Sequence, residues 1–253
     1  MDGLHDLSMV YGGGGVFGIG YCVGVAHGLA ARGIPVANAP SLGTSAGSWA
    51  ASVLALGLGF DEVSEMQVPS LPNRTPNALA DVARGLFGEA THALVKVSAV
   101  CVGTRRRHIL DGGRYPLADL VAASSAVPGV LPPHRIDGRL YVDGGVRSSA
   151  SIDAAPEAES VVVVAPLAGP HMGPIGRGAG FLLERELRAW RKRHPHRRIT
   201  LVRPNRAIAA VAGFRPSNLF DAERAKETYP LAHEQGVRAA ERIHAATAAA
   251  GAL

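Results

Sequence analysis

Residues 7–18 read LSMVYGGGGVFG, and residues 41–47 read SLGTSAG. In both places a short apolar run stops at glycine, and an apolar segment of helical length follows, over residues 19–31 and residues 46–58. The first of these segments ends before Gly33, a residue type that often ends helices because glycine adopts left-handed backbone angles without strain. Strand, turn and helix in this order, twice in succession, predict a parallel α/β architecture.

The rest of the chain continues the alternation of strands and helices. Apolar or β-branched runs predict strands at residues 93–102, 140–142, 161–165 and 199–202, and helical patterns cover residues 77–87, 117–125, 181–193 and 221–250. Pro230 could interrupt the last helix. Proline and glycine predict loops at residues 68–76 and 169–180.

Composition indicates a folded protein. Of the 253 residues, 47% are hydrophobic and 19% are charged, and no repeat or linker divides the chain, so we expect residues 1–253 to form a single domain. Cys22 and Cys101 lie in apolar surroundings without CxxC spacing, which favours buried thiols in a reducing compartment. The chain starts without a basic-then-apolar leader and has no apolar run of about 20 residues, so we expect a cytoplasmic protein.

The net charge of +5 is local, concentrated at residues 105–107 and 185–198. Residues 181–193 place Leu182, Leu183, Leu187 and Trp190 on one side of a helix and basic residues on the other. Such a helix could make peripheral contact with an anionic membrane from Phe181 to Arg198, although an apolar stripe more often packs on a sheet. No nucleic-acid partner is expected.

The segment from Gly43 to Gly47 is a G-x-S-x-G motif between a strand and a helix. In this context the serine, Ser45, lies on a strained turn that exposes its hydroxyl, and the flanking glycines leave room for the turn. The helix that follows directs its positive end towards the serine. Taken alone, the motif also fits a serine that merely caps a helix.

A nucleophilic serine needs a base, and histidine is a poor fit here. In an α/β-hydrolase the serine follows several strands, whereas Ser45 follows one strand and one helix. The downstream histidines are not at the ends of convincing strands, and two of them lie in a basic run; they are His171, His194, His196, His233 and His244.

The glycine run Gly13-x-Gly15-x-x-Gly18 also matches a dinucleotide-binding fingerprint. That interpretation needs an acidic residue about 20 positions later to bind the ribose, but residues 30–42 contain neither Asp nor Glu. A Walker motif is excluded because no Gly-Lys-Ser/Thr follows. Backbone amides of such a loop can instead form an oxyanion hole for acyl transfer.

Four segments in order resemble the patatin-like phospholipases: residues 13–18 (GGGVFG), 43–47 (GTSAG), 123–133 (ASSAVPGVLPP) and 141–145 (YVDGG). The resemblance covers about residues 7–202, followed by a C-terminal helical segment at about 221–250. It implies a three-layer α/β/α sandwich with a central, mostly parallel sheet.

The same resemblance implies a catalytic dyad without histidine. Ser45 would be the nucleophile, Asp143 its base, and Gly13, Gly14 and Gly15 the oxyanion hole. The remaining motif glycines are Gly18, Gly43, Gly47, Gly144 and Gly145. A buried carboxylate in contact with the serine can act as the base if burial raises its pKa above about 3.9.

Two observations qualify the resemblance. Asp111-Gly112-Gly113 repeats the letters of the Asp143 segment, but Arg-Tyr-Pro follows it, so we interpret it as a turn. Phe17, Ser149 and Ser151 stand where the family often has Arg or Lys, Asn and Pro, which puts substrate preference and rate in doubt more than reaction class.

The resemblance therefore implies a serine esterase that hydrolyses a phospholipid, lysophospholipid or neutral lipid, with no cofactor and no metal. An alternative is a catalytically weak lipid-binding or scaffold protein that keeps the fold. A nucleotide-binding protein is disfavoured by the missing ribose acid.

Overall fold

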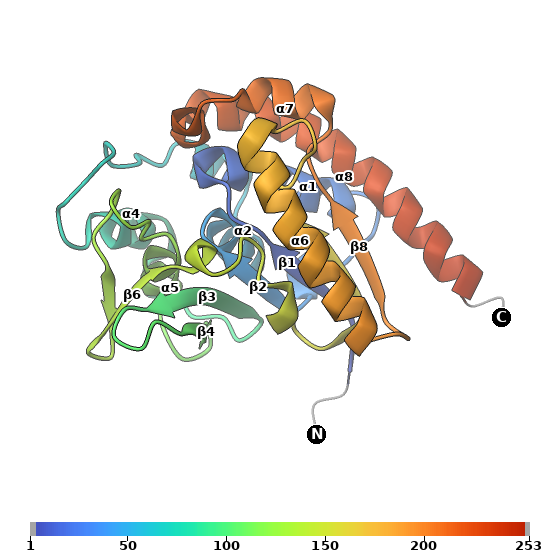
Figure 1. The fold of residues 1–253 in the computed structure, drawn as a ribbon, viewed down its shortest axis with the longest axis horizontal. Coiled ribbons are helices and arrows are strands. Elements are labelled where there is room, and N and C mark those ends of the chain that lie inside the picture. Colours follow the sequence, from blue (N-terminus) through green and yellow to red (C-terminus); the bar gives the residue numbers. More distant parts are fainter. Residues whose placement is uncertain (1–3, 251–253) are drawn as a thin grey trace.

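The computed structural model describes residues 4–250, which surround an eight-stranded sheet with strand order β5-β6-β3-β2-β1-β7-β8 and β4 beside β3 (Figure 1). Strands β8, β7, β1, β2 and β3 are parallel to one another. Strands β4 and β6 pair with β3 in antiparallel fashion, and so does β5 with β6. The strands are β1 His5–Tyr11, β2 Ser41–Thr44, β3 Val95–Cys101, β4 Arg107–Asp111, β5 His134–Ile136, β6 Arg139–Asp143, β7 Ala158–Val164 and β8 Arg198–Val202. The prediction of a mostly parallel sheet is confirmed.

Helices cover both faces of this sheet. The α-helices are α1 Gly15–Ala30, α2 Ala46–Ala55, α3 Phe60–Ser64, α4 Ala78–Phe87, α5 Leu117–Ser124, α6 Gly173–Arg193, α7 Arg206–Ala212 and α8 Ala222–Ala250. Short 3-10 helices are η1 Val36–Asn38, η2 Gly144–Val146, η3 Ile152–Ala154 and η4 Pro216–Phe220.

Side chains of the central strands point alternately to the two faces of the sheet, so the interior is divided into two cores. In β1, Met9 and Tyr11 pack in one core with α1, α2, α4, α5 and α8, whereas Val10 packs in the other core with α6. Figure 1 shows α6 in front of the sheet, with α1 and α8 behind it. This is the expected three-layer arrangement, since successive side chains of a strand point to opposite faces.

The apolar stripe of α6 packs on the sheet. Leu183, Leu187 and Trp190 are buried, while Leu182, which we expected in the same stripe, is exposed. The interpretation that favours packing over membrane contact therefore holds for these three side chains. Within residues 4–250, no helix is both long and apolar enough to cross a bilayer.

Helix α1 lies between the sheet and α8. Gly20, Gly24 and Gly28 share one face of α1, and a Cβ atom at Gly24 would lie 2.6 Å from the carbonyl oxygen of Tyr229 in α8. The two backbones approach so closely that side chains are excluded along this line. Because α1 is buried on two sides, its sequence carries no clear polar face.

The structure differs from the predicted elements in several places. Helix α6 begins at Gly173, inside the segment predicted as a loop, because Pro174 fits the first turn of a helix and Gly176 is tightly packed, where a Cβ would lie 2.3 Å from that of Met172. Helix α8 continues through Pro230 without interruption. The sequence reading also missed α3, α7 and β5.

Candidate active site

The two residues expected to form the dyad meet because two strands share one edge of β3. Strand β4 pairs with residues 96–100 of β3 and occupies one edge. At the other edge, β2 pairs with residues 95–98 and β6 with residues 99–101. Strands β2 and β6 run in opposite directions, so their carboxyl ends meet at the level of Ser98 and Ala99. Ser45 follows the end of β2, and Asp143 ends β6.

Ser45 adopts a strained backbone conformation on a tight turn. Its φ of 53° and ψ of −123° lie in a region that L-residues rarely occupy. The flanking glycines make this turn sterically feasible, since a Cβ at Gly43 would lie 2.4 Å from the Cα of Ser48, and one at Gly47 would lie 2.0 Å from the carbonyl oxygen of Tyr11. Helix α2 starts directly after Ser45, so its amino-terminal end faces the serine.

Asp143 is a buried carboxylate at the end of β6, where the end of β2 also lies. Only 5% of its surface is exposed. Burial raises the pKa of this carboxyl to about 6, and the hydrogen bonds from the Ser45 hydroxyl and the Gly145 amide oppose that increase. The Gly145 amide donates to Oδ1 over 2.6 Å. A serine hydroxyl and a carboxylate with this pKa can exchange a proton near neutral pH.

Gly144 makes room for this contact. A Cβ on Gly144 would lie 2.3 Å from the carbonyl oxygen of Ser98. Any larger residue would push the Asp143 turn away from β3 and from Ser45.

The glycine loop borders the serine, but its three amides are not equivalent. A Cβ on Gly13 would lie 3.3 Å from the Cβ of Ser45, so this glycine packs directly against the serine. Its amide, however, donates to the carbonyl oxygen of Ser149 over 2.8 Å. Within residues 4–250 no acceptor is assigned to the amides of Gly14 and Gly15, which begin α1. These two amides, at the positive end of a helix, can donate to an anion.

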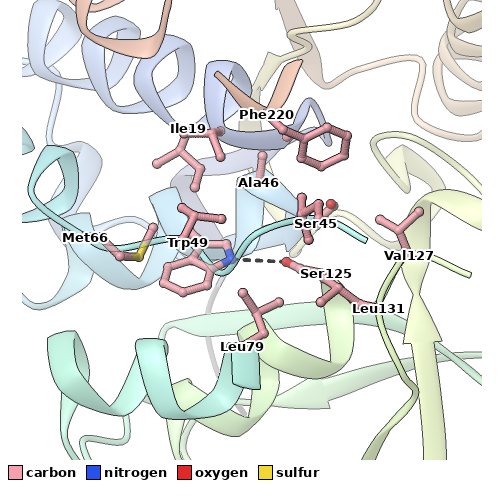
Figure 2. A pocket seen from close by; sticks show the side chains of 14 residues that line it. Ile19, Ser45, Ala46, Trp49, Met66, Leu79, Ser125, Val127, Leu131 and Phe220 are labelled. Carbon is pink, nitrogen blue, oxygen red and sulfur yellow. Dashed lines mark hydrogen bonds between the residues drawn. The ribbon is translucent and has the colours of Figure 1, made fainter. Parts of the chain in front are cut away.

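An apolar pocket opens beside Ser45 (Figure 2). Figure 2 shows Trp49, Leu79 and Phe220 around the serine, from three separate helices. The complete lining is Gly15, Val16, Ile19, Ser45, Ala46, Trp49, Met66, Val68, Leu71, Leu79, Ser125, Val127, Leu131 and Phe220. Such a wall suits a hydrocarbon chain.

Other residues considered in the sequence lie elsewhere. Asp111 is exposed at the end of β4 and accepts a hydrogen bond from the Gly113 amide over 2.8 Å, as expected for a turn. Phe17 is fully buried and stacks on Tyr21, with ring centroids 6.4 Å apart. No histidine is among the described residues that line the pocket.

A metal site is not evident in the described part of the chain. Within residues 4–250, no group of three or more His, Cys, Asp or Glu side chains is arranged to hold a metal ion.

Sequence reasoning missed several contributors to the site. The Ser125 hydroxyl accepts a hydrogen bond from Trp49 Nε1 over 3.1 Å, which fixes one wall of the pocket. The Ser124 hydroxyl accepts from the Ser45 amide over 2.8 Å. Phe220 reaches the pocket from η4, far along the chain. The ASSAVPG segment at residues 123–129 was the available signal for the two serines, although it did not reveal their contacts.

Comparisons with known proteins agree with this architecture. A family model described as patatin-like phospholipase matches residues 74–156, which include Asp143 but not Ser45. Uncharacterized NTE family proteins from Mycobacterium bovis and Mycobacterium tuberculosis are each 54% identical to the chain over 33 residues. That match covers 13% of this chain and only 9% of the length of each relative.

The crystal structure of VipD from Legionella pneumophila has a similar fold, with a TM-score of 0.50 and 13% sequence identity. The alignment covers 94% of this chain and 67% of VipD. The chain is therefore similar to the patatin-like phospholipases over residues 74–156, and its fold is similar to that of VipD.

Proposed function

We propose that the protein is a serine acyl-ester hydrolase that acts on lipids or lysolipids through a Ser45–Asp143 dyad. The observation that carries the proposal is that strained Ser45, after the end of β2, and the buried carboxyl of Asp143, at the end of β6, lie where these two strands meet, beside an apolar pocket. Burial raises the pKa of that carboxyl to about 6. A strongly shifted pKa of a buried carboxyl is typical of functional sites, which supports a catalytic role for Asp143.

In the first half of the reaction, Ser45 Oγ attacks the ester carbonyl carbon and Asp143 accepts the serine proton. The carbonyl oxygen becomes an oxyanion, and the amides of Gly14 and Gly15 donate to it. Each such donor is worth about 3 kcal/mol in the transition state. Asp143 then returns the proton to the leaving alcohol oxygen as the tetrahedral intermediate collapses to an acyl-serine.

In the second half, water replaces the alcohol. Asp143 accepts a proton from the water while the water oxygen attacks the acyl carbon. Asp143 then gives this proton to Ser45 Oγ as the bond between the acyl carbon and Ser45 Oγ breaks. The free fatty acid leaves and the enzyme is restored. Gly13 has a different role in this proposal from the one expected, because its amide is occupied by Ser149 and its contribution is close packing against the serine.

The acyl chain would occupy the apolar pocket beside Ser45. Side chains such as Trp49, Leu79 and Leu131 offer contacts to hydrocarbon and no charged group to bind a headgroup. Selection by the pocket should therefore depend on the acyl chain more than on the alcohol.

Covalent labelling with a fluorophosphonate tests the proposal. The expected result is labelling of the wild-type protein at Ser45 and none for Ser45→Ala. Asp143→Asn should lose nearly all labelling and all turnover of p-nitrophenyl esters. Asp111→Asn is the matched control, since it changes an exposed aspartate in the same Asp-Gly-Gly sequence. A folded wild-type protein that is neither labelled nor active would favour the lipid-binding or scaffold alternative.

A further inference from the structure

A serine hydroxyl is inserted between the ends of two central strands. In the parallel pairing of β2 with β3, the amide of Ser41 donates to the carbonyl oxygen of Leu94 over 2.8 Å. In a parallel pair, every second residue of a strand donates its amide to the neighbouring strand in the same way. After Ser41 and Gly43, the next residue of β2 in this series is Ser45, whose amide would therefore donate to the Ser98 carbonyl. Instead, Ser124 Oγ lies between them, accepting from the Ser45 amide and donating to the Ser98 carbonyl, each over 2.8 Å.

This bridge acts on the residue that carries the nucleophile. The carbonyl of Ser45 is already held, because it accepts from the amide of Ser48 over 2.8 Å and from its hydroxyl over 2.6 Å. The amide of Ser45 is held by Ser124. A strained conformation persists only where its surroundings hold it in place, and both polar groups of this residue are held.

The same segment also holds the aspartate. The backbone amide of Asp143 donates to the carbonyl oxygen of Ala126 over 3.0 Å. Residues 124–126 therefore accept hydrogen bonds from the backbone amides of both members of the proposed dyad. The Ser124 hydroxyl accepts from the amide of Ser45, and the Ala126 carbonyl accepts from the amide of Asp143. The intervening Ser125 holds Trp49 at the pocket wall.

We propose that residues 124–126 are a clamp that sets the geometry of the dyad, and that Ser124 is its positioning residue. By separating the Ser45 amide from Ser98, the Ser124 hydroxyl prevents β2 from continuing its pairing with β3. Ser45 then turns towards Asp143 and the pocket. Ser124 touches neither substrate nor reacting atoms, and its fully buried hydroxyl acts only through Ser45. This inference rests on the proposed esterase function.

Ser124 and Ser125 should affect different kinetic constants. Loss of the Ser124 hydroxyl leaves Ser45 free to pair with Ser98, which misplaces the nucleophile, and a displacement of about 1 Å can cost on the order of 100-fold in rate. Loss of the Ser125 hydroxyl releases Trp49 in the pocket wall, which should change substrate binding first. The split between kcat and KM separates these roles.

The experiment compares Ser124→Ala, Ser125→Ala and Ser8→Ala using a p-nitrophenyl ester, with fluorophosphonate labelling in parallel. For Ser124→Ala, we expect kcat and the labelling rate to fall about 100-fold with KM within about twofold of the wild type. For Ser125→Ala, we expect the larger change in KM. Ser8→Ala is the control, because Ser8 is equally buried and its hydroxyl donates to the carbonyl of Pro156 over 3.0 Å, far from the dyad.

The pH profile adds a readout that general loosening of the site would alter. Because the Ser45 hydroxyl opposes the rise in the pKa of Asp143, its displacement in Ser124→Ala should move the midpoint of activity above that of the wild type while kcat falls. Loosening that admits water to Asp143 would instead move the midpoint down. If Ser124→Ala fails to fold, Ser124→Cys replaces it, since a thiol of similar size hydrogen-bonds only weakly and should give an intermediate loss.

Two outcomes would overturn different claims. An unlabelled, inactive wild-type protein would contradict the esterase function itself. A labelled and active wild type, with Ser124→Ala equal to it in kcat and labelling rate, would contradict the clamp alone. A fall in kcat for Ser8→Ala as large as that for Ser124→Ala would also overturn the clamp, because the effect would then be common to buried serines.

Discussion

At the scale of single residues, Asp143 determines how the proposed chemistry depends on pH. Burial stabilises the neutral carboxyl and raises its pKa to about 6. Only the ionised carboxylate can accept the Ser45 proton. We predict that kcat/KM for a p-nitrophenyl ester falls about tenfold per pH unit below the midpoint and is constant above it. Initial rates between pH 4.5 and 8 measure this, and a midpoint near 4 would show that Asp143 is not the titrating base.

The same pKa predicts a cost in stability. The folded-state pKa of about 6 is above the ordinary value of 3.8, so the folded protein binds this proton more tightly than the unfolded chain does. Stability from this group is therefore present at low pH and is lost as the pH rises from about 4 to about 6. At pH 8, Asp143→Asn should be more stable than the wild type by up to about 3 kcal/mol.

Urea denaturation of wild type and Asp143→Asn at pH 4 and pH 8 measures the effect. The difference should shrink at pH 4, where both side chains are neutral in the folded state. Asp111→Asn, at an exposed position, should differ little from the wild type at either pH. An Asp143→Asn protein that is equally destabilised at both pH values would show that lost hydrogen bonds outweigh the burial of charge.

Residue types, their spacing and the family resemblance predicted Ser45 and Asp143 as a pair and set Asp143 apart from Asp111, and this stays a prediction. In the structure, the ends of β2 and β6, which carry these residues, meet at the level of Ser98 and Ala99. The availability of single backbone amides could not be inferred in the same way. Gly13 looks equivalent to Gly14 and Gly15 in the sequence, and only the fold shows that the Ser149 carbonyl accepts from its amide. Likewise Ser124 is one more small residue at the end of a helix until the register of β2 and β3 is known.

At the scale of elements, the contact between α1 and α8 depends on the glycines of α1. A Cβ at Gly24 would lie 2.6 Å from the Tyr229 carbonyl and 2.8 Å from the Ala232 Cβ. We predict that Gly24→Ala lowers the free energy of unfolding by about 3 kcal/mol, because overpacking must push the helices apart. Gly85→Ala in α4 is the control. It has no atom within 4 Å of the added Cβ and should raise stability by up to about 1 kcal/mol through helix propensity.

Thermal or urea unfolding of both variants measures these effects. A Gly24→Ala protein as stable as the wild type would mean that α1 and α8 do not pack at this distance in solution.

Helix α6 gives a second prediction at this scale. Leu187 is buried against the sheet, and Leu182 is exposed on the same helix. Leu187→Ala should cost about 2–5 kcal/mol of unfolding free energy, whereas Leu182→Ala should change it by less than about 0.5 kcal/mol. Urea denaturation compares the two. Equal and small effects would contradict the packing of α6 and make its apolar stripe available for a membrane surface.

Periodicity predicted the packed face of α6 because the burial of this helix is one-sided. The alternation in residues 181–193 identified the inward face of α6, apart from Leu182. The start of α6 at Gly173 could not be predicted, since glycine disfavours helices and only close packing against Met172 explains Gly176. The shared edge of β3 is a non-local property, and it is what brings the end of β2 to the end of β6.

At the scale of the whole molecule, the pocket is assembled from parts that are distant in sequence. Helices α1, α2 and α4, the segment at residues 66–71, residues 125–131 and η4 all contribute to its wall. No pattern in the sequence joins these segments, so the pocket and the place of Phe220 could not be predicted. That residues 1–253 form one domain stays a prediction, although the two cores share a single sheet.

The apolar wall predicts a preference among acyl chains. Each methylene group buried in such a pocket is worth about 0.8 kcal/mol, so kcat/KM of the wild type should rise from p-nitrophenyl acetate to butyrate and octanoate.

Leu79 lies beside Trp49 in the pocket (Figure 2). Because Leu79→Trp would fill the space for the chain, it should lower kcat/KM for the octanoate ester about tenfold or more while affecting the acetate ester far less. Leu182→Trp, on the exposed side of α6, controls for an added indole. A chain-length profile that Leu79→Trp leaves unchanged would mean that the acyl chain binds elsewhere, because no chain could pass the enlarged side chain without a loss in binding.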